Sequence, residues 1–124
     1  MNRIHLGLTA WQVARSLVRD IYELTATFPK AERFGLVSQM RRACVSIPVN
    51  IAEGAARVSL REFRRFLAIS RGSLAELETE IILANDLGYL QPSDELNSRI
   101  ARMYALLGGL IRRQSNQISE ETSK

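Results

Sequence analysis

The sequence predicts an all-α fold, an antiparallel up-down-up-down bundle of four helices that self-associates into a homo-oligomer. Two observations support the fold class: apolar residues recur at helical spacing in four long segments, and short stretches containing proline, glycine or serine separate these segments. No segment shows the strict alternation that is typical of a strand. We expect one domain over residues 1–124, with helices over about residues 9–27, 34–55, 60–87 and 94–117.

The first helix is expected to begin at Thr9, because Gln12 follows three residues later in the pattern of a capping box. The pair Phe28-Pro29 ends it. Its core-facing residues recur at steps of three and four: Val13, Leu17, Ile21, Leu24 and Phe28.

The second helix carries two apolar faces with a narrow polar stripe between them. One face consists of Leu36, Met40, Ala43, Ile47 and Ile51, and the other of Val37, Val45, Val49 and Ala52. A surface helix of a monomer buries one face, so a helix with two is expected to lie between two layers. Pro48 removes a backbone N–H in mid-segment while the apolar spacing continues across it, which predicts one kinked helix rather than two helices.

The third helix has the clearest start, because Ser59 and Glu62 stand at capping-box spacing. Gly88 is expected to end it in a left-handed conformation. Its seam alternates steps of four and three, as in a left-handed bundle: Phe63, Leu67, Ser70, Leu74, Leu77, Ile81 and Ala84. The pair Pro92-Ser93 precedes the fourth helix, whose seam is Leu96, Ile100, Met103, Leu107, Leu110 and Gln114. The polar tail after Gln117 is expected to fray.

Composition places the chain among soluble globular proteins. Apolar residues make up 46% and charged residues 24%, which excludes wholesale disorder. No run approaches the roughly 20 apolar residues of a membrane span. The first residues lack the long apolar core and cleavage site of a secretory signal. We therefore expect a cytoplasmic protein that does not act on a membrane.

Residues that could carry catalysis are scarce. The chain has one histidine, His5, and one cysteine, Cys44, so a zinc cluster of the Cys/His type cannot form. The Glu-x-x-His pairs of a di-iron bundle are absent from the sequence, and the isolated Gly54 and Gly72 form no phosphate-binding loop. We expect no enzyme activity, no metal site and no cofactor.

Arginine supplies fifteen of the seventeen basic residues in a chain of net charge +4. Arg61, Arg64, Arg65 and Arg71 share the face of the third helix opposite its apolar seam, and Arg57 precedes them. One interpretation is a solvated face. The other is a nucleic-acid-binding ridge, because a guanidinium group contacts phosphate at two points. No aromatic residue is interleaved on that face to stack on bases, so such binding would involve the backbone, with little sequence selectivity.

The segment between Gly72 and Ser98 is acidic and contains no basic residue. If the second and third helices turn back between them at about residues 56–58, Arg42 lies opposite Glu76 or Glu80. We therefore expect Arg42 to form a structural salt bridge with one of these carboxylates, and loss of one partner would strand the other charge.

The second apolar face of the second helix needs a partner. Left exposed, Val37, Val45 and Val49 would form a contiguous patch of the kind that soluble monomers avoid. The first helix offers another apolar edge, made of Trp11, Val18 and Tyr22. We expect these two surfaces to form the oligomer interface by meeting across neighbouring copies.

Two segments carry a resemblance to a known family: QMRRACVSIPVNIAEGAAR at residues 39–57 and GSLAELET at residues 72–79, together with Phe28-Pro29. The chain resembles the 23S rRNA intervening-sequence proteins, a family of four-helix bundles, from Trp11 to about Leu110. That family is similar to the accessory variability proteins of diversity-generating retroelements, which form basic pentameric rings that bind nucleic acid and a reverse transcriptase. The resemblance implies a ring of bundles with five subunits. It transfers no functional residues, because the shared segments look structural.

We therefore expect a non-enzymatic homo-oligomeric scaffold whose basic surface binds the backbone of RNA or DNA, alone or with a protein partner. The alternative is a protein–protein adaptor without nucleic-acid binding, in which the arginines meet an acidic partner. The residues assigned to nucleic-acid binding are Arg57, Arg61, Arg64, Arg65 and Arg71.

Overall fold

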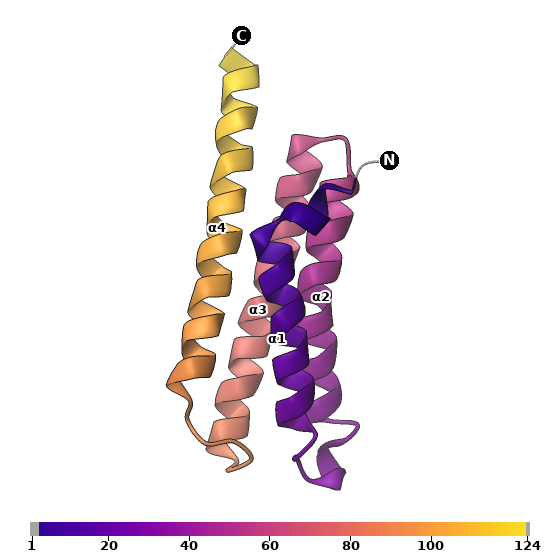
Figure 1. Cartoon of the computed structure of the whole chain (residues 1–124), viewed down its shortest axis with the longest axis vertical. Coiled ribbons are helices and arrows are strands. Elements are labelled where there is room, and N and C mark those ends of the chain that lie inside the picture. Colours follow the sequence, from indigo (N-terminus) through magenta and orange to yellow (C-terminus); the bar gives the residue numbers. More distant parts are fainter. Residues whose placement is uncertain (1–2, 124) are drawn as a thin grey trace.

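The computed structural model describes residues 3–123, and four α-helices make up most of this range (Figure 1). They are α1 (Thr9–Thr25), α2 (Leu36–Ala56), α3 (Leu60–Asp86) and α4 (Asp94–Ser123). Two short 3-10 helices, η1 (Ile4–Gly7) and η2 (Lys30–Glu32), precede α1 and α2. No strand occurs within residues 3–123. The fold is all-α with four helices, as the apolar periodicity predicts.

Contacts between α2 and α3 show how these two helices are matched along their length. The hydroxyl groups of Ser46 and Ser73 lie 2.8 Å apart in a hydrogen bond. Nearer to the loop that joins the helices, Gly54 lies against Phe66. The paired residue numbers thus rise along α2 while they fall along α3, so the two helices run in opposite directions, as Figure 1 also shows.

The two ends of α1 differ from the prediction. Leu8 rather than Thr9 is the N-cap residue, and no side chain caps this end of the helix. The side-chain amide of Gln12 donates instead to the carbonyl of Leu6, at 3.0 Å. The predicted capping box at Thr9 is therefore wrong. The helix ends at Thr25, two residues earlier than expected.

The ends of α3 follow the sequence signals. The hydroxyl of Ser59 accepts a hydrogen bond from the backbone N–H of Glu62 at 3.2 Å, which confirms Ser59 as the N-cap. Gly88 has a φ of 79°, so the left-handed end of this helix is confirmed. The N–H of Tyr89 then donates to the carbonyl of Ala84, at 2.9 Å, and satisfies one of the last free carbonyls of the helix.

The core lies along the predicted seams. In α3 the seam is buried from Leu67 onward, and in α4 all six predicted seam residues are buried. The first apolar face of α2 is buried from Met40 to Ile51. Four predicted core positions are only partly buried: Val13, Leu24, Leu36 and Phe63. Beside the last of these, Phe66 is buried instead. If α3 is rotated slightly about its own axis relative to the predicted orientation, Phe66 rather than Phe63 faces the core.

The second apolar face of α2 is only partly covered. Val37 is 8% exposed, whereas Val45 is 37% and Val49 is 53% exposed. The helix is continuous through Pro48. The chain therefore buries one face of α2 by itself and leaves much of the other accessible.

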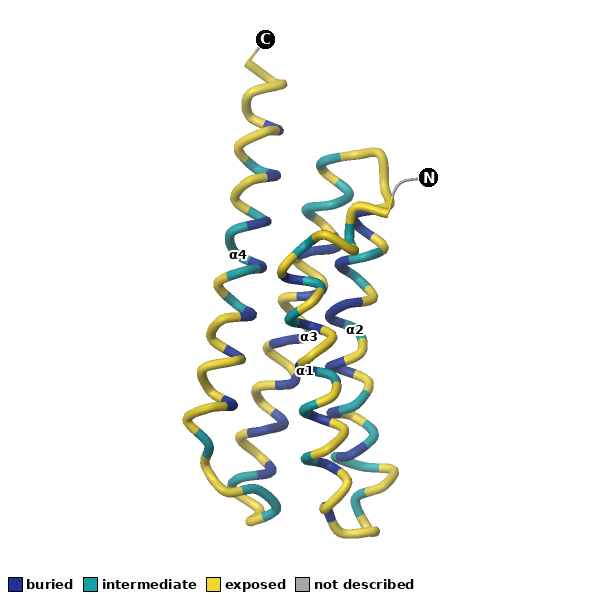
Figure 2. Tube along the Cα trace, in the orientation of Figure 1, coloured by how far each residue is buried: buried dark blue, intermediate teal, exposed yellow. Residues whose placement is uncertain are grey.

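The end of α4 is longer than predicted. The helix continues to Ser123 and does not end at about Gln117 as predicted. Ile118 is only 7% exposed, and it borders a pocket shared with Val58 of the loop between α2 and α3. The hydroxyl of Thr122 donates to the carbonyl of Ile118 at 2.8 Å. In Figure 2 the buried positions of α4 lie on the side turned toward the other helices.

Candidate functional site

A groove of about 700 Å³ runs along the outer side of α2, beside the end of α1. Three of its apolar side chains are well exposed: Tyr22 is 42%, Phe34 is 87% and Val49 is 53% exposed. The groove has three arginines and no carboxylate among its lining residues, which are Tyr22, Arg33, Phe34, Val37, Ser38, Arg41, Arg42, Val45, Ser46, Val49 and Asn50. We call this surface the α2 groove. It combines apolar side chains with positive charge.

Two of the arginines in the α2 groove are held in place by neighbouring side chains. The Nε of Arg41 donates to the hydroxyl of Thr25 at 2.9 Å, and its guanidinium carbon lies 4.5 Å from the ring centroid of Tyr22. The guanidinium of Arg33 lies 5.2 Å from the ring centroid of Phe34. Two of the three positive charges of the groove are therefore positioned on aromatic rings, at the end of the groove nearest α1.

The residues predicted for the oligomer interface are divided between two places. Tyr22, Val37, Val45 and Val49 line the α2 groove together. Trp11 and Val18 are instead half-buried and pack against the core. The ring of Trp11 is contacted by two side chains of its own chain, His5 and Arg15, each at 5.0 Å.

Sequence reasoning missed Arg33 and Phe34 as groove residues. The prediction placed Phe34 at the first position of the second helix, whereas α2 begins at Leu36 and Phe34 lies in the turn before it. The sequence did contain a signal: Phe34 is a large apolar residue between Arg33 and Gly35, close to the end of the predicted loop. A phenylalanine in such a position can be exposed and available for binding.

The arginines predicted to form a nucleic-acid-binding ridge have different surroundings. Arg57 and Arg65 both stack on the buried ring of Phe66, with guanidinium carbons 5.0 and 4.6 Å from its centroid. Each also pairs with a carboxylate, Arg57 with Glu53 at 3.2 Å and Arg65 with Glu62 at 2.7 Å. An aromatic residue therefore lies beneath this basic surface, but its ring is buried and covered by arginines, so it is not open to stacking on bases.

The other three arginines of the ridge are less constrained. Arg64 is half-buried and donates to the hydroxyl of Ser115 on α4 at 3.4 Å. Arg61 and Arg71 are exposed, and within the described part of the chain neither side chain forms a hydrogen bond or an ion pair. The ridge thus has two guanidinium groups without a partner among the described residues, those of Arg61 and Arg71. It has two more, those of Arg57 and Arg65, from which a phosphate would have to displace a carboxylate.

The predicted salt bridge of Arg42 does not form among residues 3–123. Arg42 is exposed and borders a small pocket with Glu76, but no ion pair joins it to Glu76 or Glu80. Glu80 is instead buried at 5% exposure, and its Oε1 atom has no hydrogen-bond partner. Burial, and to a lesser extent the Glu76 carboxylate, raises the pKa of Glu80 to about 7. The register between α2 and α3 was predicted correctly, but the rotation of α3 points Glu80 inward.

The single cysteine behaves as a core residue. Cys44 is fully buried, and its Sγ atom donates to the carbonyl of Arg41 at 3.2 Å. Burial raises the pKa of this thiol to about 11. Because the thiolate is the reactive form, Cys44 is a poor nucleophile near neutral pH.

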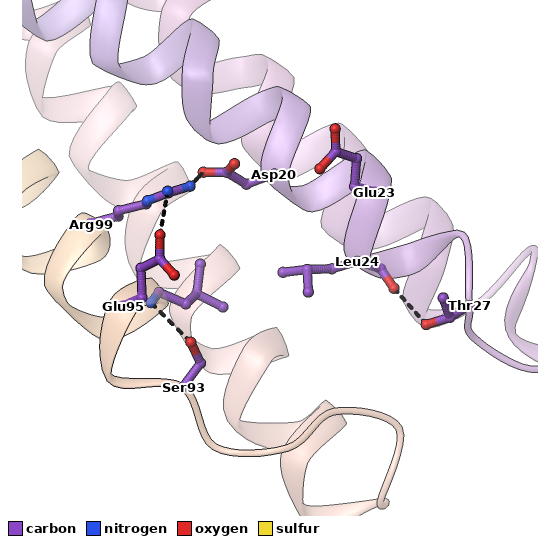
Figure 3. Close-up of a pocket in the computed structure, with 8 residues that line it drawn as sticks. Asp20, Glu23, Leu24, Thr27, Ser93, Glu95 and Arg99 are labelled. Atoms are coloured by element: carbon purple, nitrogen blue, oxygen red, sulfur yellow. Dashed lines mark hydrogen bonds and ion pairs between the residues drawn. The ribbon is translucent and has the colours of Figure 1, made fainter.

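A second pocket, of about 300 Å³, lies between the end of α1 and the start of α4 (Figure 3). Arg99 of α4 reaches across to the carboxylate of Asp20 on α1, and it also donates to Glu95 at 2.6 Å. The hydrogen bond that Arg99 donates to the Asp20 carboxylate raises the pKa of Arg99 above its ordinary value. Arg99 therefore links α4 to α1.

Across the residues that the structure describes, no group of three or more His, Cys, Asp or Glu side chains could hold a metal ion, and no helix is long and apolar enough to cross a membrane.

Comparison with known families adds to this geometry. The family model of the 23S rRNA-intervening sequence protein matches residues 7–109, which is most of the chain. The chain belongs to this family. No curated protein matches it.

In this member of the 23S rRNA-intervening sequence protein family, the segment that carries the resemblance joins α2 to α3. The side-chain amide of Asn50 donates to both the carbonyl and the hydroxyl of Ser46, at 2.8 and 2.9 Å, and Ser46 is bonded in turn to Ser73. Gly54 allows close packing, because a Cβ atom there would lie 2.6 Å from the Cβ of Phe66. These residues support helix packing.

Proposed function

We propose that this protein is a non-enzymatic homo-oligomeric scaffold of the cytoplasm whose arginine-rich surface binds the nucleic-acid backbone, alone or with a protein partner. The observation that carries the proposal is the exposure of Arg61 and Arg71 without a partner among the described residues, on the helix that also presents Arg57 and Arg65. Free guanidinium groups at the surface are the usual contacts to phosphate.

Assembly is the second part of the proposal. We propose that the helices form an up-down-up-down bundle, that α2 bends at Pro48, where a backbone N–H is missing, and that several bundles close into a ring. Five subunits are the number that the resemblance implies. In such a ring each copy repeats the ridge, so several weak sites act on one polyanion and avidity multiplies their effect.

The test is a salt titration of RNA binding by fluorescence anisotropy. We compare the wild type, the double variant Arg61→Gln/Arg71→Gln, and the charge-matched control Arg19→Gln/Arg102→Gln, whose residues are exposed on α1 and α4. In the first double variant, the log–log slope of affinity against salt should become flatter by about 0.7 for each phosphate that the protein no longer neutralises. The control should keep the wild-type slope.

Two results would contradict nucleic-acid binding through this ridge: no binding by the wild type even at low salt, or equal loss in both double variants. The alternative, a protein–protein adaptor without nucleic-acid binding, would then take its place. The observation that favours the adaptor is the α2 groove, whose apolar and basic lining suits an acidic protein surface.

A further inference from the structure

Seven of the eleven large apolar side chains that are exposed within residues 3–123 belong to two surfaces. Four of them, including Val45 and Val49, line the α2 groove. The other three are Ile82 and Leu83 near the end of α3 and Leu87 at its C-cap, which are 53%, 46% and 58% exposed. Both surfaces are accessible in the same chain, so neither covers the other.

The exposed residues around these three side chains form one face at helical spacing, which we call the α3 acidic face. It consists of Ala75, Glu76, Thr79, Ile82, Leu83, Asp86 and Leu87. Two of these seven residues are acidic, and the chain has no basic residue from Gly72 to Ser98. This surface therefore combines apolar side chains with negative charge.

We infer that the α3 acidic face of one copy occupies the α2 groove of a second copy. The charges are complementary, since the lining of the groove contains Arg33, Arg41 and Arg42 and no carboxylate, and the face has carboxylates and no base. Within one chain, only Arg42 lies beside a carboxylate of that face, Glu76. The inference deepens the proposed scaffold by naming the two surfaces that join its subunits, and it rests on the self-association proposed there.

The dimensions of the two surfaces also agree. The part of the groove on α2 runs from Val37 to Asn50, which is about 20 Å at 1.5 Å per residue. The α3 acidic face runs from Ala75 to Leu87, which is about 18 Å. One helix can therefore lie along the groove over the full length of its apolar residues, as amphipathic helices do in hydrophobic grooves.

The structure changes the interface that the sequence suggests. Tyr22 belongs to the same groove as Val45 and Val49, and Trp11 is covered by side chains of its own chain. The α1 edge is thus no separate surface that could fill the groove of a neighbour. The contact that we infer joins two different surfaces, and a contact of that kind produces rings or filaments when it is repeated.

The test uses one variant for each surface, with no nucleic acid present. Val49→Asp places a negative charge in the groove and should repel the acidic face. Ile82→Lys/Leu87→Lys places positive charges on that face and should be repelled by the groove arginines. Val58→Asp is the control, because Val58 is 105% exposed and lies outside both surfaces. Sedimentation velocity at micromolar concentration measures assembly, and circular dichroism checks helix content.

We expect the wild type and the Val58→Asp control to assemble, and each surface variant alone to sediment as a 14.0 kDa monomer. Mixing the two surface variants should produce a complex of two chains, because one intact groove and one intact face remain between them. Assembly of either surface variant at the wild-type size would overturn the inference, and so would a mixture that stays monomeric.

The outcomes separate this inference from the proposed function. If Val49→Asp is monomeric while Ile82→Lys/Leu87→Lys assembles normally, then a surface other than the α3 acidic face covers the groove. A monomeric wild type overturns self-association altogether. Binding of RNA through Arg61 and Arg71 is measured separately and can succeed or fail in each case.

Discussion

The buried hydroxyl of Ser70 on α3 donates a 2.9 Å hydrogen bond to the backbone carbonyl of Ile47 on α2. The accepting residue immediately precedes Pro48, the one residue inside α2 that has no backbone N–H. The bond therefore links the two helices at the point where the backbone hydrogen-bonding pattern of α2 is interrupted.

Replacing Ser70 by alanine should destabilise the protein by about 1–2 kcal/mol, because a buried inter-helix hydrogen bond is lost. Urea denaturation followed by circular dichroism measures this change in the free energy of unfolding. Thr79→Ala is the control: its hydroxyl is exposed and bonds only to its own helix, at the carbonyl of Ala75. If both variants lose the same stability, the bond between Ser70 and Ile47 has no special role.

Gly54→Ala should be destabilising even though alanine favours helix. A Cβ atom at this position would lie 2.6 Å from the Cβ of Phe66 and 3.1 Å from the Cδ1 of Phe63, so α2 and α3 would have to move apart. We expect a cost of about 1–3 kcal/mol. In the matched variant Gly72→Ala the added atom meets nothing within 4 Å, and thermal unfolding should show a gain of about 0.5–1 kcal/mol.

Stability should fall as the pH rises from about 5 to about 7, because of Glu80. In the unfolded chain this carboxyl loses its proton near its ordinary pKa of 4.5, whereas in the folded protein its pKa is about 7. Between these two pH values the folded protein therefore holds one more proton than the unfolded chain. The contribution of Glu80 to the free energy of unfolding is fully present below pH 4.5 and is lost as the pH rises through the folded pKa of about 7. Burial is the main cause, with Glu76 second.

The variant Glu80→Gln should remove most of this pH dependence and raise stability at pH 8 by roughly 1–3 kcal/mol, because a neutral amide replaces a buried charge. Denaturant unfolding at pH 5 and pH 8 measures both effects. Glu23→Gln, an exposed position on α1, should leave the pH profile unchanged. An unaltered profile in the Glu80 variant would show that another group titrates.

Removing the carboxylates beside the ridge should strengthen RNA binding, if the ridge binds phosphate. Glu53 and Glu62 pair with Arg57 and Arg65, and a phosphate must displace them. We expect Glu53→Gln/Glu62→Gln to raise affinity about twofold to tenfold at low salt. Anisotropy titration measures the gain. The charge-matched variant Glu23→Gln/Glu120→Gln should gain less, and an equal gain would mean that only net charge matters.

The sequence alone determined the number of helices, the core seam of α3 from Leu67 onward and that of α4, the cap at Ser59 and the left-handed Gly88. These features depend on spacing within one helix or on a few neighbouring residues, and such signals are present in any short stretch of chain. The end of α4 was missed because Ile118 has polar neighbours in the sequence, and only the structure shows that it is buried beside a pocket shared with residues 58–61.

Only the tertiary structure decided which side chains meet. It placed Tyr22 and Phe34 in one groove with Val45 and Val49, stacked Arg57 and Arg65 on Phe66, and left Glu80 buried without the expected arginine. Each of these outcomes depends on the rotation of a helix about its own axis and on its position beside its neighbours. Periodicity defines which residues share a face, but the direction of that face is set by packing among all four helices.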